Sequence, residues 1–140
     1  MTKTFIHLNL FNGVDNKIYE DSYLTVDDNG KIVAKGTGVP KDSTAKVDLQ
    51  GKYVMPGLIN AHTHIMMNPQ TNKLEFLSEA EVTFTASINS SKLMGIDDEY
   101  GTLEVGKMAD FLVLDDDPVE DVKAVQQVDK MVYKKGVKAF

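Results

Sequence analysis

The sequence predicts a mainly β fold with one helix in the middle third of the chain. Apolar and polar residues alternate near the beginning, a continuous apolar run of buried-strand type lies near the end, and turn residues separate many of the segments. The chain has 140 residues, of which 42% are hydrophobic, which predicts a single domain with a real core. A complete (β/α)₈ barrel is excluded, because that fold needs about 200 residues or more.

The first third is expected to form short strands. Residues 6–10 alternate between apolar and polar, which is the period of a half-buried strand. Residues 22–26 and 31–35 flank an Asn-Gly pair that tolerates positive φ, so a hairpin is predicted there. We interpret Asp27-Asp28-Asn29-Gly30 as the turn of this hairpin rather than a calcium loop, because the acidic spacing and the closing glutamate are missing. Another short strand pair is predicted around Gln50-Gly51.

The middle third contains the signals of one helix. Ser78 and Glu81 match the S-x-x-E capping box, in which the two side chains satisfy free backbone amides at a helix start. Gly95 is a natural stop at the carboxyl end. The helix is therefore predicted from about Glu79 to Leu93.

The last third returns to strands. Residues 111–114 form a continuous apolar run of buried-strand type. Residues 128–133 and 137–140 flank Lys134-Lys135-Gly136, which predicts a second hairpin. We interpret Asp115-Asp116-Asp117 as a solvated loop rather than a metal site, because consecutive side chains point in different directions.

Composition excludes several functions. The chain has 21 acidic residues against 15 basic ones, none of them arginine, so its net charge of −6 argues against a nucleic-acid partner. The absence of cysteine excludes disulfides, thiolate metal sites and cysteine nucleophiles. No stretch approaches the ~18 apolar residues of a membrane helix, and polar residues interrupt the first apolar run. We therefore expect no membrane association and a cytoplasmic location.

One pair of residues carries specific chemistry, His62 and His64. In a strand, residues i and i+2 face the same side, so the two imidazoles can converge on one divalent cation such as Zn²⁺. The pair is an incomplete site, because a catalytic zinc normally takes three protein ligands and leaves one position for water. Three interpretations stay open: a metal bound by this pair, a site shared between chains, and histidines on an exposed strand end with no ligand.

The segments around this pair resemble the amidohydrolase superfamily. Residues 51–64, GKYVMPGLINAHTH, resemble its opening motif G-x-x-V-x-P-G-x-I-[DN]-x-H-x-H. Residues 101–115, GTLEVGKMADFLVLD, resemble its closing motif G-x-[IL]-x-x-G-K-x-A-D-x-x-[VL]-[VL]-D, and residues 86–95 resemble its last barrel helix. Within the superfamily, the resemblance points to the dipeptidase-like and imidazolonepropionase-like branches.

The resemblance implies a composite β-sandwich, built from the amino- and carboxyl-terminal segments, with a metal-bearing barrel inserted between them. We therefore expect one domain over residues 1–140, in which residues 1–57 and 101–140 are the sandwich halves. Residues 58–100 would be the remnant of the first barrel strand and the last barrel helix. The resemblance also implies that the histidine pair ligates metal and that the family hydrolyses C–N bonds, as in amides and peptides.

The chain departs from the family where the barrel would lie. Only 13 residues separate His64 from Ser78, and the one further histidine is His7. The third metal ligand, the general base and the substrate pocket therefore have no counterparts. We expect a truncated family member that keeps the sandwich, has no catalytic residues of its own and binds no organic cofactor.

Two alternatives stay open for such a chain. One is an active or metal-binding hydrolase whose site, and small-molecule substrate, depend on oligomerisation. The other is an oligomeric structural or interaction module. A homo-oligomer is expected because apolar residues that would face the barrel, such as Leu58 and Ile65, need other cover.

Overall fold

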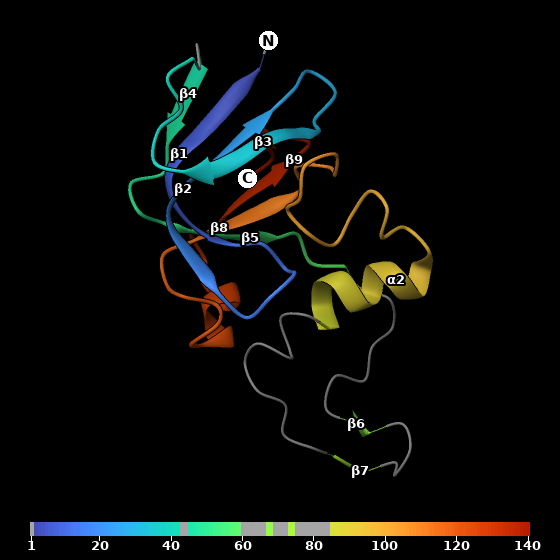
Figure 1. Ribbon diagram of the computed structural model, residues 1–140. Coiled ribbons are helices and arrows are strands. Elements are labelled where there is room, and N and C mark those ends of the chain that lie inside the picture. Colours follow the sequence, from blue (N-terminus) through green and yellow to red (C-terminus); the bar gives the residue numbers. More distant parts are fainter. Residues whose placement is uncertain (1, 43–44, 60–66, 69–72, 75–84) are drawn as a thin grey trace.

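The computed structural model describes residues 2–42, 45–59, 67–68, 73–74 and 85–140. Its main feature is a strongly curled mixed sheet, with the helical segment to one side (Figure 1). In chain order the elements are β1 (Lys3–Phe11), β2 (Ile18–Val26), β3 (Ile32–Thr37), β4 (Ala45–Asp48), β5 (Tyr53–Pro56), β6 (Met67–Asn68), β7 (Lys73–Leu74), the π-helical turn η1 (Thr85–Asn89), α2 (Ser90–Met94), β8 (Phe111–Leu114), the 3₁₀ turn η2 (Val122–Gln126), β9 (Met131–Lys134) and β10 (Val137–Lys138).

Strands from both ends of the chain share this sheet. Its order is β10-β9-β8-β5-β1-β2-β3, with β4 also paired to β1, while β6 and β7 pair only with each other. β1 is antiparallel to β2 and parallel to β5, and β5 is antiparallel to β8. The sheet curls into a half-barrel, so the prediction of a mainly β fold assembled from both terminal segments is confirmed.

The first predicted hairpin is confirmed. β2 and β3 are antiparallel, and Val26 lies opposite Ile32. In the turn, the Asp27 carboxylate accepts a hydrogen bond from the Asn29 amide at 2.9 Å, and Gly30 has φ of 79°. The aspartate thus serves as an Asx-type turn former, which is the interpretation that the sequence favoured.

The second predicted strand pair is wrong in its pairing. β4 and β5 both exist, but each pairs in parallel with β1 and not with the other. The chain between them turns at Gln50 and Gly51, which have φ of 53° and 79°, and the Gly51 amide donates to the His7 carbonyl at 2.7 Å. His7 itself has φ of 51°, where the pairing of β1 with β2 shifts register. β4 and β5 therefore follow each other along one edge of a bent strand.

The described part of the predicted helix is helical over residues 85–94. Its end at Gly95 is confirmed, because this glycine has φ of 67° and its amide donates to the Lys92 carbonyl at 3.1 Å. The predicted start, with the capping box at Ser78 and Glu81, lies outside the described residues. In the part of the chain that the structure describes, no helix is long and apolar enough to span a membrane.

The predicted buried strand and the second hairpin are confirmed, although the hairpin strands span Met131–Lys134 and Val137–Lys138 instead of residues 128–133 and 137–140. β8 is buried along its whole length and lies between β5 and β9. β9 and β10 form the second hairpin, and the turn residues Lys135 and Gly136 both have positive φ, 52° and 71°. This conformation suits a tight two-residue hairpin turn.

Two apolar clusters occupy the two faces of the central strands. On one face, the Phe5 ring meets Phe111 and Tyr133 edge-on, at centroid distances of 5.0 and 5.1 Å, and the latter two rings stack at 4.8 Å. On the other face, Met55 and Leu114 pack with residues of η2. The alternation of β8 side chains between these clusters follows from the two-residue period of a strand.

Candidate functional site

His62 and His64 lie outside the described residues, so the predicted metal site stays a prediction. The structure does place the strand that leads to them. β5 lies between β1 and β8, and the side chains of Val54 and Met55 are fully buried. The approach to the histidine pair is therefore anchored in the middle of the sheet.

Beyond β5 the chain leaves the sheet along a defined path. The Gly57 amide donates to the Asp110 carbonyl at 2.9 Å, and the Ile59 amide donates to the Ala86 carbonyl at 2.8 Å. Between them, Leu58 is about half exposed. The opening motif, the helical segment and the closing motif thus meet at this point.

Glycines make the close approach of these segments possible. Gly101 has φ of 95°, and a Cβ there would lie 2.2 Å from the Ser91 Oγ. Gly13 has φ of 80°, and a Cβ there would lie 2.9 Å from the Pro56 ring. The Ser91 hydroxyl is buried and donates to the Ile88 carbonyl at 2.8 Å, so it cannot easily move aside. The helix, the end of β1 and the closing motif are in direct contact, and neither glycine can take a side chain without displacing them.

Polar residues of the closing motif hold loops to the sheet. The Lys107 ammonium donates to the Asp97 carbonyl at 2.6 Å, and the Asp110 carboxylate accepts from the Lys135 amide at 2.7 Å. Ala109, between them, is fully buried. In the described structure, then, the polar groups of this motif have a structural role.

The remaining histidine, His7, lies at the bend of β1. Its Nδ1 is 3.1 Å from a carboxylate oxygen of Asp48, and the two side chains are 44% and 51% exposed. The pKa of Asp48 is lowered, first by the hydrogen bond from the Gln50 amide and then by the one from His7. The residues that the structure describes include no group of three or more His, Cys, Asp or Glu side chains able to hold a metal ion.

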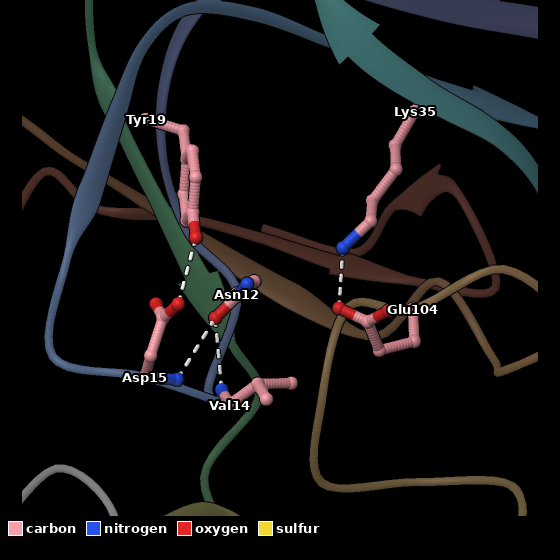
Figure 2. Close-up of polar contacts among 6 residues, drawn as sticks. All are labelled: Asn12, Val14, Asp15, Tyr19, Lys35 and Glu104. Carbon is pink, nitrogen blue, oxygen red and sulfur yellow. Dashed lines mark hydrogen bonds and ion pairs between the residues drawn. The ribbon is translucent and has the colours of Figure 1, made fainter.

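A polar cluster at the end of β1 has no counterpart among the sequence predictions (Figure 2). Asn12 is only 6% exposed, and its Oδ1 accepts hydrogen bonds from two backbone amides of the turn that follows, at 2.8 and 3.4 Å. The Tyr19 hydroxyl donates to Asp15 at 2.7 Å, and this hydrogen bond is the main reason that the pKa of Tyr19 is raised. Lys35 and Glu104 form an ion pair beside it.

A cavity of about 210 Å³ opens beside Asn12. Leu10 and Tyr19 contribute apolar surface to its lining, and Asn12 and Lys35 contribute polar groups. Because Glu104 reaches Lys35 across 69 positions of sequence, no local motif signals this arrangement.

Comparison with known protein families and curated proteins gives partial matches to the chain. Residues 75–138 match the model of the amidohydrolase family. The 5-methylthioadenosine/S-adenosylhomocysteine deaminase of Bacillus cytotoxicus is 42% identical over 55 residues, which are 38% of this chain and 13% of that protein. Adenine deaminase 1 of Oenococcus oeni is 42% identical over 66 residues, which are 43% of this chain and 11% of that protein. The chain thus spans between 11% and 13% of the length of these two relatives.

Solved structures share the fold of the described chain. A crystal structure of an amidohydrolase superimposes with a TM-score of 0.81 at 10% identity, covering 99% of this chain and 98% of that one. A Xaa-Pro dipeptidase with methionine bound in its active site superimposes with a TM-score of 0.78 at 8% identity, covering 99% of both chains. At such low identity the likeness extends to the fold alone.

Proposed function

We propose that this chain is a truncated member of the amidohydrolase family without catalytic activity of its own, and the match over residues 75–138 supports its place in that family. It retains the family's sheet domain. The chemistry implied by the family is metal-dependent hydrolysis of C–N bonds, in which a metal ion activates water for attack. The absence of catalysis is proposed from the number of metal ligands that this chain offers.

The histidine pair supplies too few ligands for a catalytic zinc. Such a zinc takes three protein ligands and one water, whereas His62 and His64 supply two. The chain has three histidines and no cysteine, and His7 lies in the sheet beside Asp48. Asp110 and Lys107, the polar residues of the closing motif, already hold backbone groups. The described residues include no ready group of three metal ligands, so a complete site would need the histidine pair and at least one further ligand.

Oligomerisation is the second part of the proposal. Leu58, Leu93 and Met94 are 49%, 71% and 55% exposed, and they lie where the chain leaves β5 and where α2 ends. Apolar side chains of this size favour burial against a partner, which supports a homo-oligomer. Light scattering coupled to size-exclusion chromatography tests this, and a monomer at high concentration would contradict it.

The names of these two relatives indicate which substrates to try first. Both relatives are deaminases of adenine-type compounds, so adenine and S-adenosylhomocysteine join small amides and dipeptides in the test panel. Deamination of such a purine replaces the amino group with oxygen from water and releases ammonia, which an ammonia-coupled assay detects.

The decisive experiment combines metal analysis with these assays. We would compare the wild type, a His62→Ala/His64→Ala double variant and a His7→Ala control, each with and without added Zn²⁺. We expect no turnover by any of them, and metal that is lost only in the double variant. Turnover that disappears in the double variant and persists in the control would refute the absence of catalysis. Equal metal content in all three would refute ligation by the pair.

A further inference from the structure

We propose that the cavity beside Asn12 binds a small carboxylate with a flat apolar body. The cavity volume of about 210 Å³ lies below the ~300 Å³ at which sites for drug-sized ligands begin, so the ligand is small. Figure 2 shows the side chains of Tyr19 and Lys35 on either side of Asn12. The cavity therefore has an aromatic wall, a cationic wall and an amide between them.

Asn12 supplies a fixed hydrogen-bond donor. Its Oδ1 accepts from the amides of Val14 and Asp15, which identifies the oxygen end of the carboxamide and holds the group in one orientation. Its Nδ2 has no acceptor among the described residues, although the residue is 94% buried. A donor that is already oriented and lines a cavity is suited to a ligand oxygen, because little ordering is needed on binding.

Lys35 supplies the charge. Its ammonium group is paired with Glu104, and the two side chains are 27% and 36% exposed. Ion pairs with this much exposure contribute little to stability, so a ligand carboxylate can take the place of Glu104 while that side chain turns into solvent. The proposal therefore makes Glu104 a competitor of the ligand.

Tyr19 and Leu10 supply the apolar surface. The Tyr19 hydroxyl donates to Asp15 at 2.7 Å, which holds the ring in place as a surface on which a flat ligand can stack. Gly36 also lines the cavity, and a Cβ there would lie 2.8 Å from the Tyr23 ring. No side chain is therefore available at this position to fill the space.

Benzoate is the probe, and its neutral analogue benzamide is the control. Binding would be followed by NMR titration of the assigned backbone amides in four proteins: the wild type, Lys35→Met, Asn12→Asp and Glu104→Gln. Asn12→Asp keeps the acceptor oxygen for the turn but removes the donor and adds a negative charge. Each protein would first be checked for a native spectrum and thermal transition.

In the wild type we expect saturable shifts at Gly36 and Thr37, and weaker binding of benzamide. Lys35→Met and Asn12→Asp should each weaken benzoate binding about tenfold or more, which is the usual effect of losing a charge-assisted hydrogen bond. Glu104→Gln should strengthen binding, because it removes the competitor. Absence of saturation, equal affinity for benzamide, or unchanged binding by Lys35→Met would overturn the proposal. If Asn12→Asp fails to fold, Lys35→Met and Glu104→Gln still test whether benzoate binds in this cavity.

Discussion

Replacing Phe111 with alanine tests whether the two terminal segments form one cooperative core. Phe111 is in β8 and only 1% exposed. Its ring lies 5.0 Å from that of Phe5 in β1 and 4.8 Å from that of Tyr133 in β9. It therefore joins strands contributed by both ends of the chain.

The magnitude follows from the buried ring. An aromatic side chain buries about 150–250 Å², worth about 4–6 kcal/mol at ~25 cal/mol per Å². Measured losses for Phe→Ala are about 3–5 kcal/mol, so we expect the free energy of unfolding to fall by about 4 kcal/mol. Because a domain of this kind has only about 5–15 kcal/mol in total, Phe111→Leu serves as a milder companion, with an expected loss of about 1–2 kcal/mol.

Urea unfolding, followed by far-UV circular dichroism and tyrosine fluorescence, measures this loss. Val128, which is 93% exposed, provides the control, since Val128→Ala should change stability by less than about 0.5 kcal/mol. A single transition with both probes is expected for every variant. A loss below about 1.5 kcal/mol for Phe111→Ala, or separate transitions for the two terminal segments, would refute a shared core.

Three further predictions concern local features. Gly101→Ala should lower the free energy of unfolding by about 2 kcal/mol or more, because the alanine would have a left-handed φ and its Cβ would clash with Ser91. In urea unfolding, the double variant Gly101→Ala/Ser91→Gly should recover part of that loss. Asp48→Asn should make the free energy of unfolding less sensitive to acid, which titration of stability at low pH would measure. The pKa of Asp48 is lowered in the folded protein, so this carboxylate stabilises the fold above pH 3.8, and the stabilisation is lost as the pH falls through the folded pKa. Tyr19→Phe should reduce the loss of stability at alkaline pH, which unfolding measured across alkaline pH would show. The hydrogen bond with Asp15 raises the pKa of the Tyr19 hydroxyl in the folded protein, so the neutral hydroxyl stabilises the fold and this stabilisation is lost above about pH 10.

The features that the sequence predicted correctly depend on neighbouring residues. The turn at Asn29-Gly30, the turn at Lys135-Gly136 and the helix end at Gly95 each require positive φ at a residue that tolerates it. The buried strand at residues 111–114 is recognisable because β8 is covered on both faces, so that its side chains are all apolar. In each case the local chemistry and the final fold favour the same conformation.

The features that the sequence did not predict depend on contacts between distant segments. Strands β4 and β5 have the spacing of a hairpin, but the bend at His7 gives each of them a separate stretch of β1 to pair with. The ion pair beside Asn12 likewise joins Lys35 of β3 to Glu104 in the loop between α2 and β8. His62 and His64 are predicted from their motif alone, because they lie outside the described residues.

Ile59 and Ala86 lie side by side, one shortly after β5 and the other in the helical segment before α2. The Ile59 amide donates to the Ala86 carbonyl at 2.8 Å, so the two ends of the connection between β5 and the helical segment lie at neighbouring points. The cost of closing a flexible connection grows only by about 0.6 kcal/mol for each doubling of its length. The sheet itself is paired entirely through strands of residues 3–56 and 111–138, which lie outside the connection. The length of this connection should therefore have little effect on the sheet, which is the physical basis for the proposal that a truncated family member keeps the fold.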